Sequence, residues 1–478
     1  MATVQSNAGY VDAPKRAIPR MPVKPARKVS IGTLLPLVIL AYSFLILPIE
    51  VKLNFAGFNI YSYRGVIIIL LIPAIVRAIK DLKSFKIFDV LILASCIWTI
   101  IAFTYRNGFE GGFLRSFAIF LDTFGAYLIA RTSVRSLSDL RAFLILIMPG
   151  VLFAGVFLLI ESLTGRLILR PLFASVFGGA VNYEGGVAQG ALQLLSERRL
   201  GLLRAYSTFS YPILGGTILA SLIPIYFLSG IRSWPFILGL AGSCFAFFTV
   251  SSAAIIALGL GFGLIMFDRL LPRLRPLNWH YVIGAGTAYA VLINFILESG
   301  IVGVIGRFTL NPATAYIRRL QWEYGTQSIS NNPIFGIGFD EYERAEWMTA
   351  AIDAHFLSIG IRDGLATPLL LFAAVILIMV AIGKRAISEK KQERDLLLAV
   401  NFSIGILVFI SMTVTYFSEA NIWFMMVLGI GGAFAAGLEP AGAQRLVRVR
   451  VPADFQGRQA AGQAAASLTR RPQPSRTR

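Results

Sequence analysis

The sequence is poor in charged side chains, in histidine and in cysteine. Only 14% of its 478 residues are charged, 56% are hydrophobic, and it has two histidines and two cysteines. This balance excludes a soluble protein, because so much apolar surface would precipitate in water. Both cysteines, Cys96 and Cys244, lie in apolar runs. They are interpreted as packing residues and give no information on the redox compartment.

The second unusual property is a net charge of +19. In a soluble protein this charge would indicate a nucleic-acid partner. Here the basic residues gather in the tails and in short loops between apolar runs, as the positive-inside rule predicts for cytoplasmic segments. We therefore expect a multi-pass membrane protein with both termini in the cytoplasm and no nucleic-acid partner.

The apolar runs predict about 12 membrane-spanning helices, because a helix needs about 20 apolar residues to cross a bilayer. We expect an all-α polytopic membrane protein with one transmembrane domain over 31–437. Its first run is long enough to act as a signal anchor. The basic tails, 1–30 and 439–478, contain few apolar residues and are expected to be disordered in the cytoplasm. The predicted spans are 31–49, 58–76, 87–105, 112–130, 142–160, 211–230, 234–250, 252–267, 279–298, 366–383, 396–416 and 422–437.

Two long polar segments, 161–210 and 299–365, fall on the side opposite the termini. Both carry arginines where the positive-inside rule depletes them, so we expect these arginines to have a function, with an anion as the ligand. Arginine suits phosphate because its planar guanidinium donates paired hydrogen bonds and keeps its charge. They are Arg166, Arg170, Arg198, Arg199, Arg204, Arg307, Arg318, Arg319, Arg344 and Arg362.

Arg204 stands shortly before a predicted span that begins near Tyr211 and Pro212. Proline is favourable at a helix start, where its missing N–H costs little. Arg204 would lie at the bilayer surface, so two interpretations stay open. It either binds an anionic ligand or extends to lipid headgroups.

The later segment places Arg318 and Arg319 one helical turn before Trp322, so that Arg318 and Trp322 can face one side. Gly336 and Gly338 predict a turn that can bring the backbone close to a ligand.

An acidic cluster, Asp340, Glu341 and Glu343, follows this turn. Carboxylates suit Mg²⁺, Ca²⁺ or Mn²⁺, but the spacing matches no metal motif. We favour a helix face with Glu/Arg pairs over a metal site, and sugar binding by Asp340 and its neighbours is a third interpretation.

Asp353 and His355 are the candidates for acid–base chemistry. The ordinary pKa of histidine, about 6.5, suits a general base, whereas an aspartate with a pKa near 3.9 is a weak base unless its surroundings raise that pKa. The alternative is that one or both are ordinary loop residues.

Charge within the predicted spans is sparse, which counts against a proton-coupled transporter. Asp122 lies in the middle of a span, and Arg64 and Arg115 lie near outer ends. Two roles are open for Asp122: an ion pair with Arg115 on the same helix, or a place in the wall of a cavity.

Together these residues resemble the O-antigen ligase/polymerase superfamily of bacterial membrane glycosyltransferases, over about Arg204 to Pro368. Three features carry the resemblance. An arginine precedes a span that starts with proline, and a second arginine is followed by an aromatic residue, a proline and a Gly-x-Gly turn. In the third, where the family has a His-Asn pair before a glycine, this sequence has Asp353 and Ala354 before Gly364, with His355 two residues out of register.

The resemblance implies a GT-C-like fold in the inner membrane, with a periplasmic active site. The expected donor is a polyprenyl-diphosphate-linked glycan, and the acceptor is another glycan; membrane lipid and a chain-length regulator are further expected partners. Arg204, Arg318 and Arg319 would hold the diphosphate, with Tyr211, Trp322, Gly336, Gly338 and Asp340 as further substrate-binding residues.

Asp353 or His355 would orient or deprotonate the acceptor, and transfer is expected to invert the anomeric centre without metal or cofactor. The departure at Asp353 favours a polysaccharide polymerase over a ligase that transfers the glycan to lipid A core. A lipid-linked sugar transporter is the third alternative.

Overall fold

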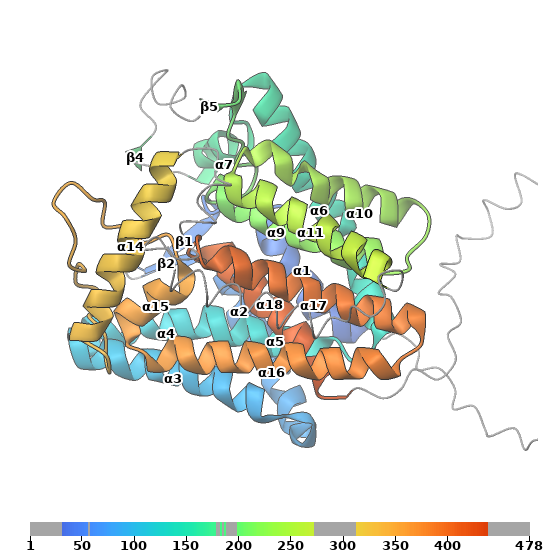
Figure 1. Cartoon of the computed structure of the whole chain (residues 1–478), viewed down its shortest axis with the longest axis horizontal. Helices are drawn as coiled ribbons and strands as arrows, with labels where there is room; N and C mark the ends of the chain where they lie inside the picture. Colours follow the sequence, from blue (N-terminus) through green and yellow to red (C-terminus); the bar gives the residue numbers. More distant parts are fainter. Residues whose placement is uncertain are drawn as a thin grey trace, which may run out of the picture. The chain divides into compact units, whose positions relative to one another are not determined.

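A computed structural model of the chain describes residues 31–55, 58–177, 182–183, 186–187, 198–271 and 312–437 (Figure 1). Both tails, Arg307 and the predicted span 279–298 lie outside the described residues. The helices are α1 (Ile31–Leu45), α2 (Ser62–Lys80), α3 (Ile87–Gly108), α4 (Leu114–Phe120), α5 (Ala126–Ser133), α6 (Leu137–Thr164), α7 (Leu169–Phe177), α9 (Pro212–Leu228), α10 (Trp234–Cys244), α11 (Ser252–Leu270), α14 (Pro312–Asn331), α15 (His355–Asp363), α16 (Ala366–Ser388), α17 (Lys391–Ser411) and α18 (Ser418–Ala435).

Short elements join these helices. Two are 3₁₀-helical, η1 (Leu82–Ser84) and η4 (Phe245–Thr249), and two are π-helical, η2 (Phe109–Phe113) and η3 (Leu121–Gly125). Sheet is limited in the described residues to three antiparallel pairs: β1 (Lys52–Phe55) with β2 (Phe58–Tyr61), β3 (Asn182–Tyr183) with β4 (Gly186–Val187), and β5 (Arg198–Arg199) with β6 (Leu202–Leu203). The helical class predicted from the sequence is confirmed.

Seven helical stretches of the described chain are long and apolar enough to cross a membrane. They are Ser62–Lys80, Ile87–Ser133, Leu137–Thr164, Ser252–Leu270, Ala366–Ser388, Lys391–Ser411 and Ser418–Ala435. Three shorter apolar helices occupy Ile31–Leu45, Pro212–Leu228 and Trp234–Thr249, where spans were also predicted. A membrane-embedded helical protein is therefore supported, while the number twelve stays a prediction.

The 47-residue stretch Ile87–Ser133 is broken at Gly108, whose φ is 72° and ψ is 179°. The chain reverses there, so that η2 and α4 pack against α3 (Figure 1). The approach is close: a Cβ at Gly112 would lie 2.1 Å from the carbonyl oxygen of Phe103. The turn falls where the sequence predicted the boundary between two spans.

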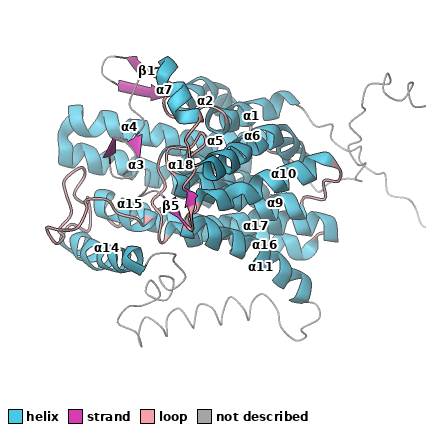
Figure 2. Cartoon of the chain, turned by 90° about the horizontal axis from the view of Figure 1, so that it is seen from above, coloured by secondary structure: helices cyan, strands magenta, loops and turns pink. Residues whose placement is uncertain are grey.

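In the core, α18 packs against α5, α9 and α17, and α17 packs against α9, with buried apolar side chains between them. Figure 2 shows these helices within the bundle. Glycine allows α18 to approach α5, because a Cβ at Gly429 would lie 2.4 Å from the carbonyl oxygen of Tyr127. The Trp423 indole donates a hydrogen bond of 2.8 Å to the Ser221 hydroxyl of α9. These contacts hold α18 against α5 and α9.

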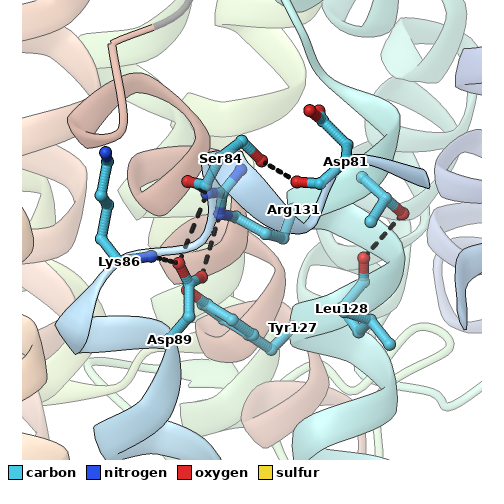
Figure 3. Close-up of polar contacts among 8 residues, drawn as sticks. Asp81, Ser84, Lys86, Asp89, Tyr127, Leu128 and Arg131 are labelled. Atoms are coloured by element: carbon cyan, nitrogen blue, oxygen red, sulfur yellow. Dashed lines mark hydrogen bonds and ion pairs between the residues drawn. The ribbon is translucent and has the colours of Figure 1, made fainter. Parts of the chain in front are cut away.

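A buried ion pair ties α3 to α5 (Figure 3). Arg131 Nε lies 3.0 Å from Asp89 Oδ1, and both side chains are 3% exposed. The same carboxylate accepts hydrogen bonds from the Tyr127 hydroxyl and the Lys86 backbone N–H, and Arg131 also donates to the Ser84 carbonyl. Arg131 lies in the last turn of α5, so the ion pair is buried at the end of that helix.

Candidate functional site

A cavity of about 690 Å³ lies where the first turns of α2, α9, α11, α16 and α18 meet α3 and α15. Three aspartates line it: Asp122, Asp353 and Asp363. Five arginines also line it: Arg64, Arg199, Arg204, Arg318 and Arg362. The formal charge of this lining is positive, which favours an anionic ligand.

The cavity lies at one end of these helices, and the basic residues predicted to be cytoplasmic lie at the other. α2 begins at the cavity with Arg64 and ends with Arg77 and Lys80. α16 begins near Thr367 at the cavity and carries Arg385 in its last turn. The arrangement agrees with the orientation derived from the positive-inside rule.

Arg204 lies inside the cavity wall with 4% of its surface exposed. The buried carboxylate of Glu161, at the end of α6, fixes the loop that contains Arg204, because it accepts hydrogen bonds from the backbone N–H groups of Tyr206 (3.1 Å) and Ser207 (2.8 Å). Ser207 has a φ of 53°, a conformation that these bonds hold in place. Extension of Arg204 to lipid headgroups is therefore wrong, because the side chain is enclosed by protein.

Arg170 contacts the loop that follows Arg204, but it is not among the residues that line the cavity. Its guanidinium is 2.7 Å from the Glu50 carboxylate, 1% and 4% of the two side chains being exposed. It donates to the Ser210 carbonyl and lies over the Tyr206 ring, 5.2 Å from its centroid. Ser210 also donates its N–H and hydroxyl to Glu419. The prediction of an anion-binding role for Arg170 is corrected to a structural one.

Arg318 of α14 is 7% exposed and lines the cavity together with Asp353. Gln321, one turn later, accepts a hydrogen bond from the Asp353 N–H (3.1 Å) and donates one to the Ala351 carbonyl (2.8 Å). The glutamine therefore holds the Asp353 loop against the helix that carries Arg318. Of the predicted site residues, the structure brings together Arg204, Tyr211, Arg318, Asp353 and His355.

Five predicted site residues are not among those that line the cavity: Arg319, Trp322, Gly336, Gly338 and Asp340. The Trp322 indole donates to the Met412 carbonyl (3.2 Å), and its ring packs on a small apolar cluster that includes Leu357. Trp322 is therefore one helical turn from Arg318, as predicted, but it anchors α14 to its neighbours and does not line the cavity. Arg319 is half-buried and Asp340 is exposed.

Gly336 and Gly338 do form a turn, with φ values of 61° and 65°. The close approach that these glycines allow is to α15 and α3, and not to a ligand. The Gly338 N–H donates to the Arg362 carbonyl (3.0 Å), and a Cβ at Gly336 would lie 2.4 Å from that oxygen. A Cβ at Gly338 would contact Asn107 of α3. The predicted ligand contact is corrected to a packing contact that positions α15.

The acidic cluster forms a loop and not the expected helix face. The expected Glu/Arg pair is present between Glu341 and Arg344, at 2.6 Å, and Glu343 accepts a hydrogen bond from Asn331. Within the described ranges, no three His, Cys, Asp or Glu side chains gather as metal ligands would.

His355 begins α15 and is enclosed by aromatic rings, with its centroid 5.4 Å from that of Tyr416 and 6.1 Å from that of Phe424. Burial lowers the pKa of His355 to about 4, so the imidazole is neutral at pH 7. Its Nδ1 is buried without a hydrogen-bond partner. It is part of a helix and of the cavity wall, which excludes the interpretation as an ordinary loop residue.

Asp363, the last residue of α15, was not among the site residues predicted from the sequence. Its side chain is 3% exposed, and its Oδ2 accepts a hydrogen bond of 2.5 Å from the Thr99 hydroxyl of α3. Burial raises the pKa of this carboxyl to about 7. The signal was available, because an amphipathic helix spaces one face by three and four residues. The α15 residues that line the cavity follow that spacing: His355, Ser358, Ile359, Arg362 and Asp363.

Of the two roles left open for Asp122, the structure supports a place in the cavity wall and not an ion pair with Arg115. Asp122 pairs with Arg64 of α2, while Arg115 lies over the Phe339 ring, 5.0 Å from its centroid. Asp122 belongs to the π-helical turn η3. Such turns are rare in proteins, and those that occur are often found at functional sites.

Comparisons with known protein families and with curated proteins find no match for this chain. A functional assignment therefore depends on the residues of the cavity themselves.

Proposed function

We propose that this protein is a membrane glycosyltransferase that polymerises polyprenyl-diphosphate-linked oligosaccharide repeat units into a surface polysaccharide or exopolysaccharide. The observation that carries the proposal is the meeting of Arg204 and Arg318 in one cavity. They are far apart in the sequence, each is at most 7% exposed, and three further arginines line the same space. With five arginines and three aspartates in its lining, the cavity has a positive formal charge, which favours an anionic ligand.

A diphosphate leaving group fits this cavity better than a carboxylate or a single phosphate, because it offers charge and oxygen atoms to several guanidinium groups at once. Fixed cations stabilise the charge that develops as the bond to the sugar breaks, and their effect is strong where water is excluded. Arg204 and Arg318 would supply this stabilisation, so we propose transfer without a metal, with inversion at the anomeric carbon.

The volume of the cavity, about 690 Å³, is in the range of binding sites for small molecules. It accommodates the diphosphate and the first sugars, whereas the polyprenyl chain would remain among the apolar helices and lipid. This division suits a substrate that is carried by the membrane. It is a second reason to propose a lipid-linked donor.

We place the protein in the bacterial inner membrane with the cavity on the periplasmic face. The support is the separation of the cavity from the basic helix ends, since basic residues favour the cytoplasmic side. A repeat unit that has already been moved across the membrane would then reach the cavity directly.

The test is a reconstituted assay with a labelled polyprenyl-diphosphate oligosaccharide as the only substrate and EDTA present. A ladder of longer lipid-linked glycans, absent with R318A, is the expected result. Transfer only after addition of lipid A core would identify a ligase. Movement of the substrate across the bilayer without any new glycosidic bond would identify a transporter.

A further inference from the structure

One corner of the cavity is built from three elements that pack on one another: α15, α3 and α16. It contains the Asp363 carboxyl, the Thr99 hydroxyl that donates to it, and the Thr367 hydroxyl. Thr367 is 6% exposed, and its buried Oγ1 lies close enough to the Asp363 carboxyl to help lower the pKa of that group. The corner therefore places one carboxyl and two hydroxyls on the cavity wall, and these groups can exchange hydrogen bonds with a bound ligand.

We propose that this corner, formed by Asp363, Thr99 and Thr367, binds the acceptor sugar, and that Asp363 accepts the proton of the attacking hydroxyl. The inference rests on the proposed glycosyl transfer and assigns its acceptor subsite. Neither Asp353 nor His355 is then the catalytic base.

The chemistry of the corner suits a sugar hydroxyl better than a phosphate. A carboxylate accepts a hydrogen bond from a neutral hydroxyl and repels a phosphate oxygen, while Thr367 can donate to or accept from the same sugar. The donor diphosphate would be held by Arg204 and Arg318, which belong to other elements. Two substrates can therefore be told apart by charge within one cavity.

Asp363 is held rigidly. The Trp98 indole of α3 donates to the Asp363 carbonyl (3.1 Å), and the turn after α14 donates the Ile337 and Gly338 N–H groups to carbonyls of the same helix end. Its neighbour Gly364 has a φ of 80° and lets the chain pass against the Ile334 carbonyl. A base must be fixed within hydrogen-bond reach of the proton that it removes, and these contacts meet that need.

The strength of the available bases points the same way. A general base works best when its pKa is near the working pH, which holds for Asp363, at about 7, and not for His355, at about 4. Burial raises the pKa of Asp363, while the Thr99 hydroxyl, the Arg362 guanidinium and the Thr367 hydroxyl lower it. The Cys96 thiol of α3 is the other titratable group that interacts with it in the described chain.

The proposed step balances as follows. The O–H bond of the acceptor breaks and its proton moves to an Asp363 oxygen, while the acceptor oxygen forms a bond to the anomeric carbon of the donor. The bond from that carbon to the phosphate oxygen breaks, and its electron pair stays on the diphosphate. The products are the extended glycan, polyprenyl diphosphate and a protonated Asp363, which then releases its proton to water.

The test measures kcat against pH for wild type, D363N and T99V in the reconstituted assay. Wild-type kcat should fall below a pH near 7, which gives the pH profile an acidic limb. The D363N variant should have a kcat about 100-fold lower or more, and its profile should lack this acidic limb. T99V removes the Thr99 hydrogen bond, which favours the ionised form of Asp363, so the acidic limb of its pH profile should move to higher pH. The control is E346Q, an exposed acid of the neighbouring loop, which should behave as wild type.

Binding of labelled polyprenyl diphosphate separates this inference from the proposed function. D363N should bind it as tightly as wild type, because only the acceptor corner is changed. Wild-type kcat and an unchanged limb in D363N would overturn the assignment of Asp363, as would a limb that T99V does not move. No glycosyl transfer by wild type would instead overturn the proposed function.

Discussion

Arg64 and Asp122 form an ion pair across the cavity wall, with Arg64 Nη2 2.6 Å from Asp122 Oδ2 and Arg64 Nε 3.0 Å from Oδ1. The pair joins the first turn of α2 to the π-helical turn η3. Its side chains are 21% and 11% exposed, so it is shielded from water but not sealed from the cavity.

Replacing Arg64 with Ala should lower the free energy of unfolding by about 2–4 kcal/mol, because it leaves the Asp122 carboxylate buried without its partner. The double variant R64A/D122A should be less destabilised than R64A. Unfolding in detergent micelles measures both. Equal destabilisation of the two would contradict the pair. R344A, which breaks the exposed pair with Glu341, should cost less than about 1 kcal/mol.

Replacing Arg318 with Ala should abolish polymer in cells while the protein still inserts at normal levels. R318K should recover only part of the activity, because lysine keeps the charge but lacks the planar fork. The matched control is R344A, an arginine of the same segment whose partner is outside the cavity. Polymer of normal length and amount from R318A would exclude Arg318 from the diphosphate site.

The buried His355 predicts a specific pH dependence of stability. Its pKa is about 4 in the folded protein and about 6.5 when unfolded, so the unfolded state binds more protons between these values. Stability should therefore fall as the pH falls from 6.5 to 4, by up to about 1.4 kcal/mol per pH unit. The slope in H355F should be shallower over that range. Melting temperatures measured at several pH values check this, and parallel curves would show that the imidazole is not buried.

Gly364 should not tolerate a side chain. Its φ is 80°, and an added Cβ would lie 2.0 Å from the Ile334 carbonyl oxygen. G364A is expected to destabilise the protein and to lower activity, since it displaces Asp363 and the start of α16. Gly263 of α11 has open space around it, so G263A should be neutral or slightly stabilising. Thermal unfolding and activity of the two variants give the comparison, and equal behaviour would contradict it.

The orientation of the cavity can be tested by labelling. In a background without cysteine, N331C at the end of α14 should react with a membrane-impermeant maleimide in intact spheroplasts. K390C, at the basic end between α16 and α17, should react only after permeabilisation. Both positions are polar and outside the apolar stretches. The reverse pattern would place the cavity in the cytoplasm.

Much of the helical organisation follows from the sequence, because apolar runs long enough to cross a membrane are a strong and local signal. Among the described residues, each predicted span overlaps a helix, and even the reversal at Gly108 falls at a predicted boundary. Arg204, Arg318 and Asp353 were predicted as site residues from separate parts of the sequence, and all three line the cavity.

The errors concern contacts between elements, which no local pattern contains. Trp322 has the spacing of a site residue, but its indole meets the Met412 carbonyl, and Gly336 meets α15 and not a ligand. Asp122 of the π-helical turn η3 pairs with Arg64 of α2, a helix distant in sequence, so local spacing did not indicate this partner. Asp363 was missed because its burial, and with it the raised pKa, depends on how α15 packs on α3.

The most direct test of the central claim is binding of labelled polyprenyl diphosphate to the protein in lipid nanodiscs. Wild type should bind it in the presence of EDTA, more tightly than polyprenyl monophosphate, and R204A/R318A should lose at least about tenfold in affinity, since each charge-assisted contact is worth about 1.5–3 kcal/mol. R344A should bind as wild type does. Equal affinity of wild type and R204A/R318A would show that this cavity is not the diphosphate site.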